Sequence, residues 1–165
     1  MISIVPITPL NVLTFKAVRL RALQDNPLAF SATYANESQL TDSEWLARTQ
    51  RWNGEKGIGF LAMDDATACG IAGSFLDQND ATRAQLISMW TAPTHRRRGA
   101  GRLLVNEVLH WARSRNARTL LLLVTSHNEP AIRFYEQLGF TRTGRTQPYP
   151  NDPAVLEFEM SRPIP

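Results

Sequence analysis

The stretch MWTAPTHRRRGAGRLL, residues 89–104, decides the fold. A proline ends an extended segment, three arginines follow, and two glycines, Gly99 and Gly101, precede an amphipathic segment. A loop of this composition aims backbone N–H groups and the positive end of a helix dipole at one point. The sequence therefore predicts a pyrophosphate-binding loop at the start of a helix. The loop carries four cations: Arg96, Arg97, Arg98 and Arg102.

The loop differs from two familiar glycine-rich phosphate-binding patterns. Leu104 stands where the dinucleotide fingerprint would carry its third glycine, and no Lys–Ser/Thr pair follows Gly101 as in a Walker A loop. Residues 96–101 instead form the pattern R-x-x-G-x-G. This pattern, placed after a strand that ends at a proline, resembles the nucleotide-binding motif of the GNAT (N-acetyltransferase) superfamily.

A second stretch, NEPAIRFYEQLGF at residues 128–140, resembles a later helix of the same superfamily. That helix carries an asparagine, an alanine three residues on, a tyrosine four residues further and a closing L-G-F. Both motifs are present here in the family's order. The resemblance covers residues 82–145, and DNPLAF at residues 25–30 extends it to the link between the first two helices.

Length and composition indicate one globular domain, so we expect a single acetyltransferase domain over residues 1–165. The hydrophobic content of 43% and the charged content of 20% are ordinary. No apolar run reaches the ~18 residues that a bilayer span requires. The first ten residues lack the basic start and the cleavage site of a signal peptide. We therefore expect a cytoplasmic protein without a membrane partner.

Cysteine and histidine usage argues against a metal site. The single cysteine, Cys69, excludes an internal disulfide and a multi-cysteine site, and the three histidines lack ligand-like spacing. The net charge is +3, and the basic residues concentrate at 96–102 and 113–118. This clustering fits a polyphosphate ligand better than a nucleic acid, which we do not expect as a partner.

Hydrophobic periodicity predicts seven strands and four helices. The strands are expected at residues 2–7, 58–63, 69–76, 85–91, 119–124, 140–143 and 155–160. The helices are expected at residues 12–23, from 41 or 42 to 52, from near 99 onward, and around 131–138. A proline-rich loop with Pro148, Tyr149, Pro150 and Pro153 is expected between the last two strands.

Three local signals support these assignments. Thr41 and Glu44 form a capping-box pattern at the start of the second helix. The run TLLLLV at residues 119–124 is typical of a buried parallel strand, and Gly139 suits the position after a helix end. The resulting order is β-α-α-β-β-β-α-β-α-β-β. It describes an α/β (α+β) fold with a central mixed, mostly antiparallel sheet flanked by helices, as the GNAT resemblance also implies.

The resemblance implies acetyl-CoA as the cosubstrate, with no metal. The loop would hold the coenzyme pyrophosphate, pantetheine would lie along the preceding strand, and Asn128 would bind a pantetheine amide, cap its helix, or do both. The implied coenzyme-binding residues are Met89, Trp90, Thr91, Arg96, Arg97, Arg98, Gly99, Ala100, Gly101, Arg102 and Asn128.

Tyr135 is the catalytic candidate. The superfamily places a tyrosine here whose hydroxyl protonates the departing thiolate. The alternative is that Tyr135, which lies on the apolar stripe of its helix, is a core residue with a satisfied hydroxyl.

The sequence assigns no general base. Many relatives use a glutamate on the strand before the glycine loop, but that strand reads AQLISMWTAP here and contains no acid. Proton removal could run through water or use Glu37, Glu157 or Glu159, each of which could equally be a surface acid. Four aromatic residues could line an acceptor pocket or serve in packing: Phe30, Tyr34, Trp52 and Tyr149.

The sequence thus predicts an N-acetyltransferase that transfers an acetyl group from acetyl-CoA to a primary amine of a small molecule, peptide or protein. The alternative is a non-catalytic acyl-CoA-binding sensor of the same fold, which the absent glutamate keeps open. Similar enzymes are often homodimers, but no interface is specified by the sequence.

Overall fold

The computed structural model describes residues 1–165, whose secondary structure is that of a mixed α/β protein. The strands are β1 Ile2–Pro6, β2 Gly57–Asp64, β3 Thr67–Leu76, β4 Arg83–Thr91, β5 Thr119–Thr125, β6 Thr141–Tyr149 and β7 Asp152–Pro163. The helices are α1 Val12–Asp25, α2 Tyr34–Glu37, α3 Asp42–Arg51, α4 Ala100–Ser114 and α5 Glu129–Gln137. Three short 3-10 turns are η1 Pro9–Asn11, η2 Pro27–Ala29 and η3 Pro93–His95.

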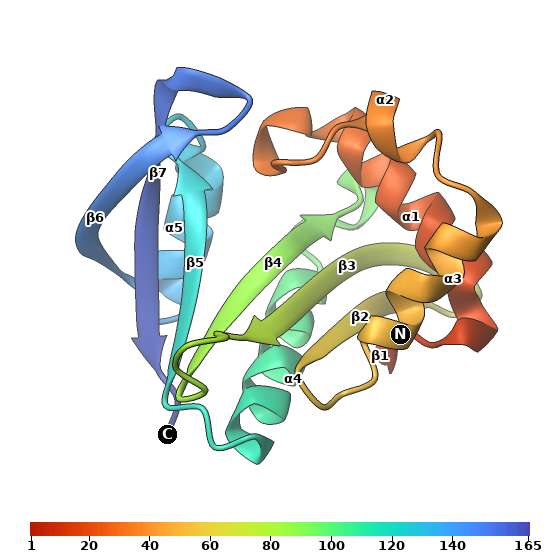
Figure 1. Ribbon diagram of the computed structural model, residues 1–165, viewed down its shortest axis with the longest axis horizontal. Helices are drawn as coiled ribbons and strands as arrows, with labels where there is room; N and C mark the ends of the chain where they lie inside the picture. The colour runs from red at the N-terminus through yellow and green to blue at the C-terminus, as the bar shows by residue number, and fades with distance from the viewer.

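The seven strands form one sheet in the order β1-β2-β3-β4-β5-β7-β6 (Figure 1). Every neighbouring pair is antiparallel except β4 and β5, which are parallel. The predicted fold class and element order are confirmed, with α2 as a four-residue addition between the first two predicted helices.

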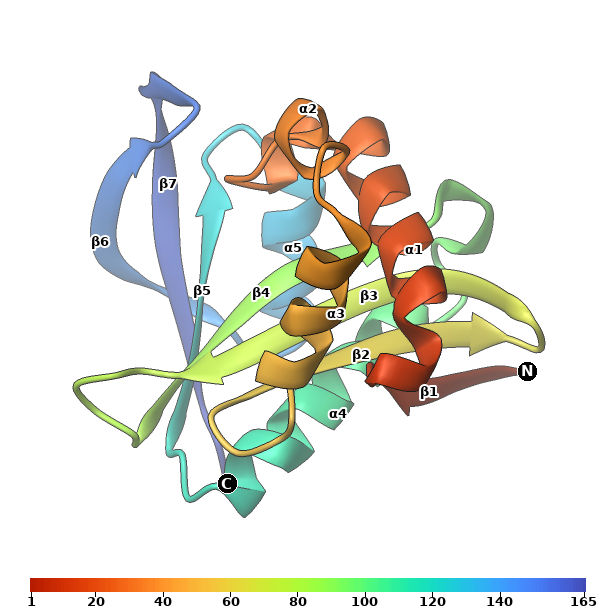
Figure 2. The ribbon, with the colours of Figure 1, turned by 45° about the vertical axis from the view of Figure 1, so that its right-hand side comes forward.

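Helices cover the two halves of the sheet differently. α1 and α3 pack on one face of the N-terminal strands and α4 on the other, so that half is a three-layer structure (Figures 1 and 2). α5 lies on the same side as α4, behind β5 (Figure 1). The opposite face of β5 and β7 therefore has no helix over its length.

The local signals read from the sequence explain why these elements form. The capping box at the start of α3 is present, because the Thr41 hydroxyl accepts from the Glu44 N–H and the Glu44 carboxylate accepts from the Thr41 N–H. Gly139 follows α5 with φ +90°, a left-handed conformation that glycine adopts without strain. These two predictions are confirmed.

The C-terminal hairpin corrects one prediction. Residues 148–153 were expected to form a loop, but β6 continues to Tyr149 and β7 begins at Asp152. β6 is the edge strand of the sheet, so Pro148 can occupy it without breaking an internal ladder of hydrogen bonds. Position at an edge outweighs the usual effect of proline on a strand.

β4 and β5 separate soon after they meet. They pair only at Arg83–Thr119, Ala84–Leu120 and Gln85–Leu121, and beyond this point β5 keeps its full antiparallel pairing with β7. β4 also bulges against β3, where Ser88 and Met89 of β4 lie opposite the single residue Ala72 of β3, and Ser88 has φ +58°. The bulge turns the end of β4 away from β5.

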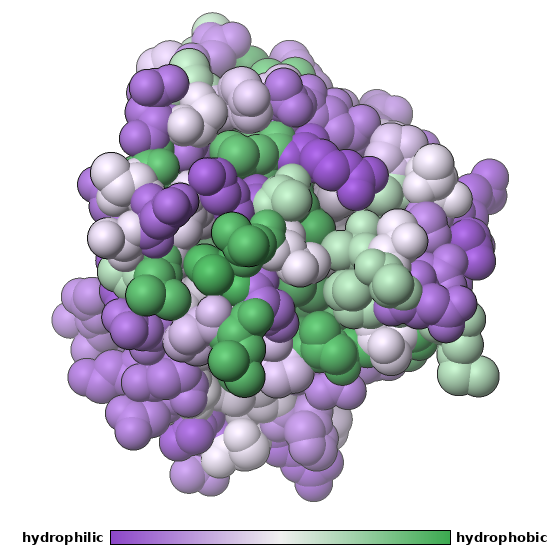
Figure 3. Space-filling view, turned by 90° about the vertical axis from the view of Figure 1, so that its right-hand side faces the viewer, coloured by the Kyte–Doolittle hydropathy of each residue, from purple (hydrophilic) through white to green (hydrophobic).

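None of the helices combines the length and the apolar character needed to cross a lipid bilayer. Apolar side chains nevertheless lie in the open on the face shown in Figure 3. Single exposed leucines occur in η1, α1 and α3: Leu10, Leu13 and Leu46.

Candidate active site

A cavity of about 1380 Å³ opens where β4 and β5 separate. Its walls come from the last seven residues of β4, the last four of β5, the start of α4, one side of α5 and the segment around η2. The cavity therefore exists because the two parallel strands diverge. It brings together the two motifs that the sequence singled out, residues 96–102 and 128–140.

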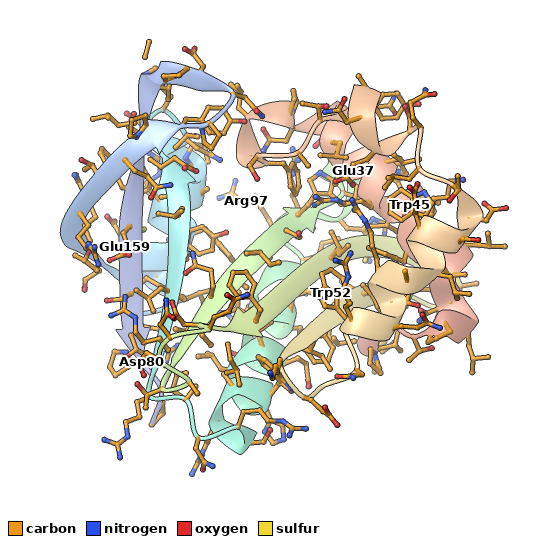
Figure 4. The ribbon with its side chains drawn as sticks, viewed as in Figure 1. Glu37, Trp45, Trp52, Asp80, Arg97 and Glu159 are labelled. Carbon is orange, nitrogen blue, oxygen red and sulfur yellow. The ribbon has the colours of Figure 1, made fainter.

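Two of the four loop arginines face the cavity with no partner in the protein. Arg97 and Arg102 line it, and neither forms a hydrogen bond or an ion pair through its side chain. Figure 4 shows Arg97 between the diverging ends of β4 and β5. A guanidinium without a partner keeps all its donors available for a phosphate or another anion.

The other two arginines are held by carboxylates. Arg96 donates to Asp25 at 2.6 Å and to the Thr91 carbonyl at 3.1 Å, although it also lines the cavity. Arg98 extends to Asp64 at 3.5 Å and lies outside the cavity lining. The structure therefore does not bring Arg98 to the site predicted for it.

The start of α4 presents backbone donors to the cavity. The first helical bond runs from the Leu103 N–H to the Gly99 carbonyl, so the preceding N–H groups of Ala100, Gly101 and Arg102 have no intrahelical acceptor. Gly99 precedes the helix with φ +90°, and an added Cβ there would meet nothing within 4 Å. The left-handed conformation favours glycine at this position, and the space above it is open.

Gly101 also has a role in packing. A Cβ at Gly101 would lie 2.9 Å from Cζ of Phe134 and 3.2 Å from Cε of Met89. The glycine lets α4 approach the side chains of α5 and β4 closely, so its small size serves packing within the protein.

The predicted pantetheine strand has a free edge. From Leu86 to Thr91, β4 pairs with β3 on one side and has no strand on the other, where Met89 and Thr91 line the cavity. The indole of Trp90 is buried and donates to Asp25 at 2.9 Å, so Trp90 can offer a ligand only its main chain.

Asn128 and Tyr135 both line the cavity from α5. The Asn128 side-chain oxygen accepts from the Ala131 N–H at 3.3 Å, which caps the helix and leaves its NH₂ group free. The Tyr135 ring is buried against Phe134 and Phe140, and its hydroxyl has no protein partner. Burial raises the pKa of Tyr135, so the phenol stays protonated at neutral pH.

The three candidate bases occupy different environments. Glu37 is buried and paired with Arg19 at 2.9 Å and Arg48 at 3.0 Å. Burial alone would raise the pKa of Glu37, but hydrogen bonds and charge from the two arginines outweigh it and lower the pKa. Glu159 accepts from the Thr143 hydroxyl outside the cavity, on β7 in Figure 4, whereas Glu157 lines the cavity.

The four aromatic candidates for the acceptor pocket also lie in different places. Phe30 lines the cavity, while Tyr34 does not. Trp52 packs against Gly59 and Gly73 beneath β2 and β3, where either glycine would clash with the indole if it carried a Cβ. Tyr149 is buried and its hydroxyl donates to the Phe30 carbonyl, so it joins the C-terminal hairpin to η2.

Sequence analysis missed Arg19, a cavity residue. Arg19 lies on α1, grips the Glu37 carboxylate with two nitrogens, and donates to the Ser88 hydroxyl at 3.0 Å. Its position on the helical face next to Phe15 and Ala22 gave no sign of this, because its partners lie 18 and 69 residues away in sequence.

Comparison with known sequences shows the family to which a chain with this fold and cavity belongs. The model of the Acetyltransferase (GNAT) family matches residues 22–140. The chain therefore belongs to the GNAT acetyltransferase family, whose members use acetyl-CoA as cosubstrate.

Two curated relatives illustrate its range. The chain is 30% identical to the [ribosomal protein bS18]-alanine N-acetyltransferase of Escherichia coli K12 over 121 residues, 72% of this chain and 80% of that protein. It is 31% identical to the mycothiol acetyltransferase of Corynebacterium glutamicum strain R over 90 residues, 54% of this chain. The matched part is about a quarter (26%) of the length of that mycothiol acetyltransferase.

Solved structures share the fold over the whole chain. A GNAT-family acetyltransferase from Streptococcus pneumoniae superposes with a TM-score of 0.84 at 21% identity, covering 100% of both chains. An acetyltransferase from Salmonella typhimurium, solved with its cofactor acetyl-CoA, superposes with a TM-score of 0.78 at 17% identity, covering 100% of this chain and 95% of that one.

Proposed function

We propose that this protein is an acetyl-CoA-dependent N-acetyltransferase whose acceptor is a primary amine. One observation carries the proposal. A single cavity combines unpaired cations and free N–H groups at the start of α4, an unpaired strand edge on β4, and a protonated phenol on α5. These are the features needed to hold a long phosphorylated thioester and to assist its reaction.

The donor would lie along the α4 end of the cavity. Arg97, Arg102 and the first N–H groups of α4 would bind the pyrophosphate. The open edge of β4 at Met89–Thr91 would pair with the amides of pantetheine, and the free NH₂ of Asn128 would bind a pantetheine carbonyl. Acetyl-CoA, when bound, supplies an acetyl group activated as a thioester.

Acyl transfer forms a C–N bond to the amine and breaks the C–S bond of the thioester. A proton must leave the nitrogen, and a proton must reach the coenzyme sulfur. Tyr135 would supply the second proton, since its hydroxyl has no protein partner and burial keeps the phenol protonated. The amine reacts in its neutral form, which makes up about one alkylamine in a thousand at pH 7, and the proton that nitrogen loses as the C–N bond forms would pass to solvent through the open cavity.

A free-thiol assay tests the proposal. The purified protein is mixed with acetyl-CoA and a panel of primary amines, and release of the coenzyme thiol is followed together with the mass of the acetylated amine. Thiol release that requires an amine and yields the amide supports the enzyme. Tight binding of acetyl-CoA with no acetylated product from any amine class would instead support the acyl-CoA sensor.

A further inference from the structure

One face of the sheet carries exposed apolar side chains beside the cavity. Phe75 pairs with Gln85 across β3 and β4, and Gln85 pairs with Leu121 across β4 and β5. Paired residues share a face, and so do residues two apart in a strand, so Phe75 and Leu123 project from the same face. Both line the cavity, yet they are 42% and 38% exposed. This is the face that α4 and α5 leave uncovered.

Leu28 of η2 is a third exposed apolar residue of the cavity. It lines the same cavity and is 58% exposed. The Tyr149 hydroxyl fixes the segment, because it lies within hydrogen-bonding distance of the carbonyls of Pro27 and Phe30, on either side of Leu28. Exposed apolar residues gathered around one cavity are typical of a ligand site, whereas leucines scattered singly over a surface are not.

A carboxylate lies on the same face. Glu157 is opposite Thr125 on β5 and opposite Gln147 on β6. Thr125 is two residues from Leu123, so Glu157 shares the face of the apolar side chains. The Gln147 amide donates to Glu157 Oε1 at 3.1 Å, which orients the carboxylate and leaves Oε2 without a partner.

The charges of the cavity single out Glu157. Only two carboxylates line the cavity, and the other, Asp25, is bound by Arg96 and the Trp90 indole. Glu157 has no cationic partner. The unpaired cations of the cavity, Arg97 and Arg102, come from the loop before α4 and from its first turn, whereas Glu157 comes from β7, so unpaired positive and unpaired negative charge come from different walls.

We propose that Glu157 and Gln147, together with the apolar surface of Leu28, Phe75 and Leu123, form the acceptor site of this protein. The site takes a primary amine with an apolar or aromatic body and no carboxylate beside the nitrogen. Glu157 binds the ammonium group, the apolar side chains bind the body, and a neighbouring carboxylate on the ligand would be repelled by Glu157. This inference rests on the proposed function, since it names the class of amine that the enzyme would acetylate.

Equilibrium binding to the protein saturated with coenzyme A tests the site without turnover. The probes are 2-phenylethylamine, and phenylalanine, which adds only a carboxylate. At pH 7, calorimetry should show that 2-phenylethylamine binds at least about tenfold more tightly than phenylalanine. Both ligands carry an ammonium group that Glu157 attracts, but the carboxylate of phenylalanine is repelled by Glu157.

Matched variants assign the effect to one carboxylate. Glu157→Gln keeps the shape of the side chain and removes its charge, and it should weaken 2-phenylethylamine binding by about 10- to 100-fold. Glu159→Gln makes the same change two residues along the same face but outside the cavity, and it should leave binding unchanged. In the thiol assay, Glu157→Gln should raise the KM of the amine and leave the KM of acetyl-CoA unchanged.

Three results would overturn the inference. These are no binding of 2-phenylethylamine to wild type, tighter binding of phenylalanine than of the amine, and equal effects of Glu157→Gln and Glu159→Gln. Coenzyme A binding is measured first on the same sample, and it distinguishes failure of the acceptor site from failure of the proposed function. If coenzyme A binds and the amine does not, the acceptor class is wrong while the donor site stands.

Discussion

Two regions beside the cavity differ in whether their polar side chains have protein partners. On the open side these side chains have none, and on the closed side they pair with each other. On the side built by α4 and α5, Arg97, Arg102 and the Tyr135 hydroxyl have no protein partners. On the closed side, Arg19 of α1 lines the cavity and is bound to Glu37 of α2, which lies outside the lining. Unpartnered polar groups beside a cavity leave hydrogen-bonding capacity for a ligand, whereas a closed network stabilises the fold. Substitutions on the two sides should therefore affect different measurements.

The largest effect is expected from Tyr135→Phe on the open side. The ring and its contacts with Phe134 and Phe140 remain, and only the proton donor is lost. If Tyr135 protonates the leaving thiolate, kcat should fall by about 10²- to 10⁴-fold, while the dissociation constant of coenzyme A and the melting temperature change little. An unchanged kcat with any accepted amine would make Tyr135 a core residue.

The closed side should respond in stability. Glu37→Gln removes the shared carboxylate and leaves Arg19 and Arg48 facing each other with no anion between them. Breaking a buried pair from one partner costs about 3 kcal/mol, so the free energy of unfolding in urea at pH 7 should drop by about that amount. Glu107→Gln, an exposed change on α4, is the matched control and should have little effect.

Acid titration tests whether the negative charge of Glu37 is what stabilises the folded protein. Its pKa in the folded protein lies below the ordinary value of 4.5, so the stabilisation is fully present above pH 4.5 and is lost as the pH falls through the folded pKa. Wild type should lose stability in this range faster than Glu37→Gln, and the difference between them should narrow. A difference that stays constant down to pH 3 would contradict a charge-based role.

The loop arginines should differ in their effect on coenzyme A affinity, because Arg97 and Arg102 have no protein partner and Arg98 has one. The double change Arg97→Gln with Arg102→Gln should weaken coenzyme A binding by on the order of 10²-fold, because both donate charge to the cavity. Arg98→Gln should change the affinity by no more than about threefold, since Arg98 extends to Asp64 on the surface. Equal effects of Arg98 and Arg97 substitutions, measured by calorimetry, would show that the loop rearranges on binding.

The smallest expected effect is that of Gly99→Ala. The φ of +90° is strained for alanine, and unfolding should become easier by about 1 kcal/mol. Gly144→Ala in β6 is a close match, with φ +91° and the same empty space around the added Cβ. Both variants should lose similar stability, but only Gly99→Ala should weaken coenzyme A binding. A loss of affinity in both would mean that the Gly99 effect is one of stability.

Much of the fold was predictable because its signals are local. The capping box at Thr41, the glycine after α5 and the order of helices and strands along the chain all follow from residues close in sequence. The C-terminal hairpin was not predictable from Pro148, because only the position of β6 at the sheet edge makes that proline acceptable. The bulge at Ser88 is a main-chain feature and leaves no mark on residue type.

The site was predictable in composition and not in detail. Residues of the two motifs meet in one cavity, but the sequence treated four arginines alike. Whether an arginine is free depends on which carboxylates the fold brings near, as Asp25 does for Arg96 and Asp64 for Arg98. Whether Glu37, Glu157 or Glu159 is paired or lines the cavity depends in the same way on neighbours that are distant in sequence.

The divergence of β4 and β5 also bears on aggregation. A strand edge with unpaired N–H and C=O groups normally invites pairing with other chains. Here the free edge of β4 lies inside the molecule, with β5 and α5 as the opposite walls of the cavity. If pantetheine pairs with this edge as proposed, the chain has a hydrogen-bonding strand edge for its ligand that is flanked by its own β5 and α5 and not placed at the outer border of the sheet.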